Sequence, residues 1–179
     1  MARLFAGHAV SETAATRVHF RAGPEAVWNR VVFYEEVPGS PPFLLRAFLP
    51  RPLGTEGDKT RVGERVRCVY RESELVKRIT VVEPARLLQF EVVEQNLGIE
   101  GCVLTQGGSY QFFPCGDGTD VALVTDYRAF LHPRHLWRPL EALLVRSLHR
   151  HILGAVRAAL LPAGSLARAA VLPSQCFHR

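Results

Sequence analysis

The sequence predicts an α+β domain in which an antiparallel sheet packs against one long C-terminal helix. Apolar residues recur every three or four positions over residues 133–160, which is typical of an amphipathic helix. Over residues 62–130 the period changes to two, the pattern of strands with one buried face. The connections between these strands are short and carry turn residues, so they indicate antiparallel hairpins in series and not βαβ units.

The first part of the chain predicts one strand and one or two short helices. Residues 16–21 alternate between apolar and polar side chains, as a strand does. Pro24 suits the first position of a helix, whose apolar stripe includes Trp28. The prolines within residues 37–42 end that helix. Residues 43–49 form either a second short helix or an extended segment.

We expect a loop over residues 50–61 and then a meander of five strands. These are predicted at residues 62–70, 75–82, 87–94, 102–113 and 120–130. Pro84 lies in a four-residue turn, and Asp117-Gly118 is a strong hairpin signal because glycine tolerates positive φ. Gly107-Gly108, inside a long strand, indicates the bulge or bend that a curved sheet requires.

The long helix has an apolar face that we expect to cover the sheet, since neither surface is stable in water alone. That face contains Leu136, Trp137, Leu140, Leu143, Leu144, Leu148, Ile152, Ala155 and Ala159. The opposite side contains Arg138, Arg146, His149, Arg150 and Arg157. At about 100° per residue, Ser147 and His151 fall within the apolar arc, whereas His149 points away.

The composition is that of a single globular domain. The chain has 179 residues, of which 47% are hydrophobic and 22% charged, enough for a substantial core. We expect the domain to cover residues 16–161, with a lead-in over residues 1–15 and a flexible tail over residues 162–179. There is no uncharged apolar run of membrane-spanning length and no convincing signal peptide. These features predict a soluble, cytoplasmic protein.

The basic charge does not indicate a nucleic-acid partner. The net charge is +5, but the arginines are scattered along the chain and form no basic face with interleaved aromatic residues. Lys59 and Lys77 are the only lysines. Arg78 and Glu91, on neighbouring predicted strands, are expected to form a solvated salt bridge on the outer sheet face.

No metal or cofactor is expected either. The four cysteines have no CxxC or other metal-type spacing. The histidine pairs at residues 132/135 and 149/151 lack a nearby cysteine or carboxylate to complete a ligand set. The GxGxxG, P-loop and GxSxG motifs of nucleotide binding and serine hydrolysis are absent from the sequence.

Three segments resemble the START-like or SRPBCC superfamily, which includes polyketide cyclase/dehydrase-type and Bet v 1-like proteins. Residues 20–28 (FRAGPEAVW) resemble its first strand and helix, residues 78–90 (RITVVEPARLLQF) its strand–turn–strand passage, and residues 117–121 (DGTDV) its last hairpin. The similarity covers residues 16–161. It implies the helix-grip fold: a curved antiparallel sheet wrapped around the C-terminal helix, with one or two short helices after the first strand and a cavity between sheet and helix.

Given this resemblance, the inward faces of the strands and the helix predict a cavity for a small molecule. Apolar walls with a few polar groups are typical of such pockets. The candidate ligand-binding residues are Phe90, Tyr110, Phe112, Leu123, Thr125, Tyr127, Leu144, Ser147, Leu148 and His151. The ligand would be a hydrophobic or aromatic, lipid- or polyketide-like molecule. Without the resemblance, the same residues are better interpreted as a filled core.

Two other functions stay open at this stage. A polyketide cyclase or dehydratase would use His151 as acid and base, because histidine titrates near neutral pH. An interaction protein would form a homodimer through the outer sheet face, where Phe113, Ala122 and Val124 are predicted to lie.

Overall fold

The computed structural model describes residues 6–33, 52–71 and 73–160. In chain order they form β1 (Ala6–Phe20), α1 (Pro24–Phe33), β2 (Pro52–Glu56), β3 (Arg65–Tyr70), β4 (Ser73–Glu83), β5 (Leu87–Asn96), β6 (Val103–Cys115), β7 (Gly118–Leu131) and α3 (Arg134–Leu160).

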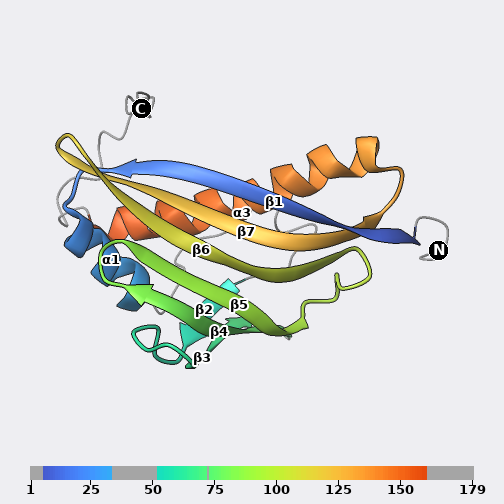
Figure 1. Ribbon diagram of the computed structural model, residues 1–179, viewed down its shortest axis with the longest axis horizontal. Coiled ribbons are helices and arrows are strands. Elements are labelled where there is room, and N and C mark those ends of the chain that lie inside the picture. The colour runs from blue at the N-terminus through green and yellow to red at the C-terminus, as the bar shows by residue number, and fades with distance from the viewer. Residues whose placement is uncertain (1–5, 34–51, 72, 161–179) are drawn as a thin grey trace.

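The described strands form one antiparallel sheet in the order β1-β7-β6-β5-β4-β3-β2. Strands β2 to β7 pair with their neighbours in the chain, whereas β1 pairs with β7 and forms the far edge. Figure 1 shows the sheet curving, with α3 running along β1 and β7 and α1 at one end of the strands. The predicted α+β class, curved antiparallel sheet and long C-terminal helix are confirmed.

The inward faces of the strands and of α1 form the main core. Tyr110 pairs with Leu123, and Phe112 pairs with Val121, across β6 and β7. Trp28 of α1 packs edge-on against Phe112, with the ring centroids 5.4 Å apart. Such aromatic pairs add about 1 kcal/mol to the energy of burial alone. This contact fixes α1 on the sheet.

Two strand predictions were wrong in extent. β1 begins at Ala6 and not at residue 16, and β2 lies within residues 50–61, where the sequence predicted a loop. Residues 8–15 are mostly small or polar, yet from Val10 onwards they pair with β7. Backbone pairing with a neighbouring strand, β7 for β1 and β3 for β2, forms both elements, and an apolar pattern does not report it. The predicted segments 43–49 and 162–179 lie outside the described residues.

A bulge lies directly before the Gly107-Gly108 pair, close to the place that the sequence predicts. The register of β6 against β7 shifts between Thr105 and Gly107. A Cβ atom at Gly108 would lie 2.2 Å from the carbonyl oxygen of Val124, so only glycine permits this approach of the two strands. The bulge increases the local twist and helps the sheet to curve.

The outer face of β3, β4 and β5 carries salt bridges. The predicted pair is confirmed, with Arg78 Nε 2.6 Å from Glu91 Oε1 and both side chains about half exposed. The same face also carries the pairs Arg67–Glu74 and Arg65–Glu94. Exposed pairs of this type contribute little to stability, about 0–1 kcal/mol each.

The buried face of α3 differs from the predicted one. Leu136 and Leu143 expose 59% and 46% of their surface. The buried residues of the helix are Glu141, His149, Leu153, Ala155 and Val156. The predicted face was therefore wrong in part. Glu141 and His149 are buried because they are paired with polar partners, whereas a hydrophobic pattern assigns both to the surface.

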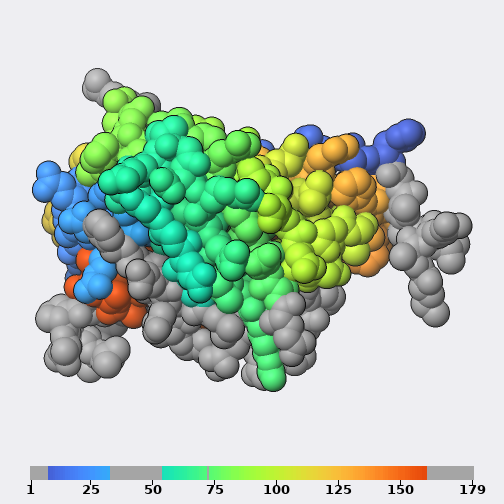
Figure 2. All heavy atoms as spheres, turned by 90° about the horizontal axis from the view of Figure 1, so that it is seen from below, coloured from blue at the N-terminus to red at the C-terminus, as the bar shows by residue number. Residues whose placement is uncertain are grey.

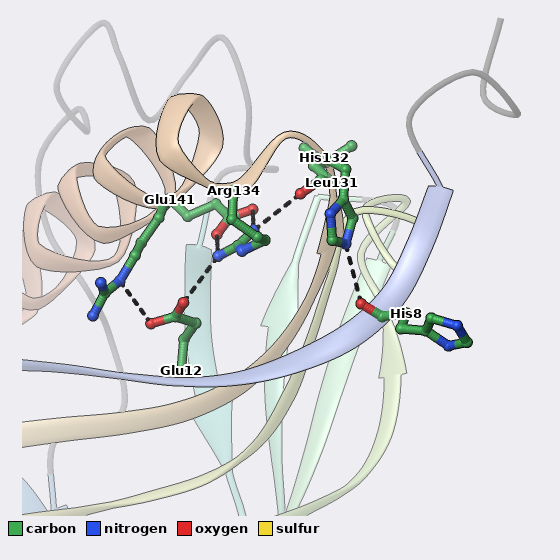
Figure 3. Close-up of polar contacts among 7 residues, drawn as sticks. His8, Glu12, Leu131, His132, Arg134 and Glu141 are labelled. Atoms are coloured by element: carbon green, nitrogen blue, oxygen red, sulfur yellow. Dashed lines mark hydrogen bonds and ion pairs between the residues drawn. The ribbon is translucent and has the colours of Figure 1, made fainter.

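A buried ion-pair network attaches the start of α3 to β1 (Figure 3). Arg134 donates two hydrogen bonds to the Glu141 carboxylate, at 2.9 and 2.7 Å, and one to Glu12 at 3.2 Å. Arg134 also donates to the Leu131 carbonyl, and Arg138 binds the other oxygen of Glu12. The hydrogen bonds to Glu141 raise the pKa of Arg134, so the guanidinium stays charged.

Replacing Glu141 by alanine should lower the free energy of unfolding by about 3–5 kcal/mol, because the variant leaves the Arg134 guanidinium without its bidentate partner. Urea unfolding followed by circular dichroism measures the loss. Arg138→Ala is the matched control in the same network. Its side chain is 69% exposed, so its removal should cost less than about 1 kcal/mol. Equal losses for the two variants would contradict an anchoring role for the Arg134–Glu141 pair.

Candidate functional site

A cavity of about 50 Å³ lies between α1 and strands β2 to β6. Its described lining residues are Val31, Thr55, Lys59, Val66, Cys68, Lys77, Ile79, Leu88, Phe90 and Tyr110. Figure 2 views the molecule from this side, where residues of β2 and β3, in teal, lie beside those of β4, in green. The walls are largely aliphatic and aromatic, and the polar groups come from several different strands.

Strand alternation directs Lys77 into the cavity. Lys77 pairs with Val66 of β3 and shares its face of β4 with Ile79, whereas Arg78 between them binds Glu91 on the outer surface. Its ammonium nitrogen lies 4.3 Å from the centre of the Phe90 ring. A cation over an aromatic face is stabilised by about 0.5–2 kcal/mol, more where water is excluded.

The electrostatic surroundings keep Lys77 protonated. Burial alone lowers the pKa of Lys77, but the Cys68 thiol and the Tyr110 and Tyr70 hydroxyls more than offset it, so the pKa is raised. The ammonium also forms a side-chain hydrogen bond with Cys68. Burial raises the pKa of Tyr70 and of Tyr110, so both hydroxyls stay neutral. The Lys77 ammonium thus lies in the cavity beside the neutral Tyr110 hydroxyl and the Cys68 side chain.

Both lysines of the chain line this cavity. Neither was predicted from the sequence as a site residue. The signal that could have identified Lys77 is strand parity, because Lys77 alternates with the buried residues Leu75 and Ile79. A lysine between two buried apolar positions on one strand face points inwards. For Lys59, which lies in a loop before β3, periodicity offers no comparable signal.

The predicted strand residues divide between the cavity and the core. Phe90 and Tyr110 line the cavity. Phe112 and Leu123 are buried in the main core, and Tyr127 lies in a second, smaller core cluster. Thr125 forms a hydrogen bond with α3 and is described below.

The predicted residues of α3, in contrast, do not line the cavity. They are Leu144, Ser147, Leu148 and His151, and all four are partly exposed. Burial lowers the pKa of His151. Its Nε2 atom is buried and has no hydrogen-bond partner within the part of the chain that the structure describes.

It is His149 that faces the sheet. The prediction that His149 points away was wrong, since only 1% of its surface is exposed. Its Nε2 lies 2.8 Å from the Thr125 hydroxyl oxygen, and its Nδ1 lies 3.1 Å from that of Thr16. Burial, with smaller contributions from Lys77 and Arg146, lowers the pKa of His149 to about 4. The imidazole is therefore neutral at physiological pH and is held between two hydroxyls.

A cluster at the β6–β7 hairpin has metal-type residues but not a metal-type arrangement. His19, Cys115 and Asp120 place their ligand atoms within 4.8 Å of one another. Cys115 is disulfide-bonded and so offers no thiolate. The Asp120 carboxylate is already shared between His19 Nδ1, at 2.7 Å, and Arg17 Nε, at 3.2 Å. We therefore interpret this cluster as a structural ion pair.

The fold has known counterparts. Comparison with protein-family models and with curated proteins finds no match. Among solved structures, norcoclaurine synthase from Thalictrum flavum is 13% identical with a TM-score of 0.58, over 86% of this chain and 95% of that one. The Aha1 dimer from Colwellia psychrerythraea is 12% identical with a TM-score of 0.54, over 83% and 96% of the two chains. A protein of Thermus thermophilus is 18% identical with a TM-score of 0.52, over 84% and 100%.

The chain has the START-like, helix-grip fold. The resemblance seen in the sequence is thereby confirmed at the level of the fold. Identities this low carry no activity from one protein to another. Within the described residues, no helix combines the length and the hydropathy that crossing a membrane requires.

Acid should destabilise the fold through His149. Its pKa is about 4 in the folded chain, against an ordinary 6.5, so the unfolded state takes up a proton first as the pH falls. The stability that neutral His149 contributes is complete above pH 6.5 and decreases as the pH falls towards 4. The total loss is about 3 kcal/mol.

Urea midpoints measured between about pH 7.5 and pH 4 test this prediction. The wild type should lose more stability over that interval than His149→Gln, which carries no imidazole. The exposed His135 provides the control, because His135→Gln should keep the wild-type pH dependence. Parallel curves for the wild type and His149→Gln would show that His149 does not cause the effect.

Proposed function

We propose that this chain binds a small hydrophobic or aromatic molecule in the cavity between α1 and strands β2 to β6. The observation that supports this is the composition of the cavity. Its walls are largely apolar, and its polar groups converge on one space: Lys77, Tyr110, Cys68 and Thr55 come from four strands, and Lys59 comes from the loop before β3. Convergent polar groups within an apolar enclosure orient a ligand, while burial of its apolar surface supplies affinity.

The size of the cavity restricts the ligand. The enclosed volume is about 50 Å³, whereas pockets for drug-sized ligands have about 300–1,000 Å³. A single water needs about 10–15 Å³ of such space, so a group of about three to five non-hydrogen atoms fits. A longer lipid- or polyketide-like molecule would place one end here, and the rest would require side chains to move.

The two alternatives have less support. A cyclase or dehydratase with His151 as acid and base has less support, because His151 does not line this cavity. For dimerisation, the Aha1 neighbour is a dimer, but the exposed aromatic residue of the outer face here already contacts a charged side chain of its own chain. Phe113 is 40% exposed, and the Arg17 guanidinium carbon lies 4.7 Å from the centre of its ring. Ligand binding is therefore the function we propose.

A titration of ¹⁵N-labelled protein with 1-propanol tests the proposal with a neutral probe of fitting size. The amide signals of residues around the cavity should shift and saturate. Cys68→Leu should abolish the saturable shift, because the larger side chain fills the space. Cys102→Leu is the matched control, since Cys102 is the other free cysteine and does not line the cavity. Absence of saturable shifts in the wild type, or unchanged binding in Cys68→Leu, would overturn the proposed site.

A further inference from the structure

We propose that the ligand carries a carboxylate and that the Lys77 ammonium is its counter-ion in the cavity. This inference rests on the proposed function, because it names the chemical class of the molecule that the same cavity binds. It follows from the ion pairing of the surrounding strands, from the groups around Lys77 and from the size of the enclosed space.

The acidic side chains of the neighbouring strands form ion pairs on the outer face of the sheet. Glu74, Glu91 and Glu94 are each paired with an arginine on the outer face. Strand alternation places Lys77 on the inner face, where none of the salt bridges formed among the described residues includes it. The arginines are thus neutralised within the sheet, whereas Lys77 faces the cavity with its charge.

The groups around Lys77 compensate only part of the cost of burying an ammonium. The Phe90 ring lies under its nitrogen, at 4.3 Å from the ring centre, and Cys68 shares a hydrogen bond with it. Both interactions are weaker than an ion pair, and a buried cation is stable when an anion and hydrogen bonds satisfy it. The raised pKa of Lys77 means that the charge persists at neutral pH. A ligand carboxylate supplies the missing partner.

The remaining lining suits the other parts of a carboxylic acid. The Tyr110 hydroxyl comes from β6, on the opposite side of Phe90 from β4, and can donate to a second carboxylate oxygen. Val31, Val66 and Ile79 provide aliphatic surface for a short carbon chain. A carboxylate with one or two further carbons has four or five non-hydrogen atoms, which matches the enclosed volume of about 50 Å³.

The test compares propionate with propionamide, two probes of the same size that differ in charge. Both are titrated at neutral pH into ¹⁵N-labelled full-length chain, and amide shifts around the cavity give the dissociation constants. We expect propionate to bind at least about 10-fold more tightly, since hydrogen bonds to charged groups contribute about 1.5–3 kcal/mol. Lys77→Met should remove this preference. Arg78→Met, which deletes the neighbouring charge on the outer face, should retain it.

The outcomes separate the two proposals. Equal binding of propionate and propionamide by the wild type would overturn the carboxylate inference and leave the proposed binding function intact. A preference that survives in Lys77→Met, or that Arg78→Met also removes, would show that a charge other than that of Lys77 alone selects the anion, and would likewise overturn the inference. If propionate, propionamide and 1-propanol all fail to bind at the cavity, the proposed function itself fails. The comparison of the two probes needs only the wild type, so it can still overturn the inference if Lys77→Met does not fold.

Discussion

The fold depends on the alignment of α3 with β1. Polar contacts join the two elements at three points along their length: Glu12 with Arg134, Thr16 with His149, and the His19 carbonyl with Arg157. The helix advances about 1.5 Å per residue and the strand about 3.3 Å, so eight helix residues span nearly the same length as three or four strand residues. The step of eight residues from His149 to Arg157 on the helix is therefore close in length to the step of three residues from Thr16 to His19 on the strand, about 12 Å against about 10 Å. Because β1 is also hydrogen-bonded to β7, the same contacts hold the helix against the far edge of the sheet.

This arrangement divides the inside of the sheet into two parts. Under α3, near β1 and β7, the polar groups form hydrogen bonds with one another. Thr125 and Tyr127 belong to this packed interior. Under α1, near β2 to β6, the cavity keeps unfilled space, and Lys77 faces it. The long helix therefore stabilises the domain, whereas the short one closes the candidate site. For this reason the predicted residues on β7 and α3 contribute to the fold and not to the cavity lining.

The sequence was sufficient for the architecture because the architecture depends on periodicity and turns. The period of two, the hairpin at residues 115–118 and the irregularity beside Gly107-Gly108 all reflect local chemistry, and each has its counterpart in the structure. The turn itself is one residue earlier than predicted, because Gly116 has the positive φ and Gly118 pairs with Cys115 as the first residue of β7. The features that were missed depend on partners distant in sequence. β1 is long because β7 is long.

The same reason applies to the site. His149 is buried because two hydroxyls form hydrogen bonds with its ring nitrogens. A helical projection shows only the residues of the helix and therefore cannot show those hydroxyls. Phe90 and Tyr110 were found because both are apolar in character and lie on inward strand faces. Lys77 was missed because a charged residue in a strand usually faces water. Only its alternation with Leu75 and Ile79 indicates otherwise.

The distribution of the basic residues distinguishes the cavity chemically from the rest of the chain. The chain has 22 basic residues other than histidine, and only Lys59 and Lys77 among them are lysines. The guanidinium of arginine remains protonated and is not an amine nucleophile. Both side-chain primary amines therefore line the cavity. An isotope carried by lysine would therefore report on the residues that line this one space.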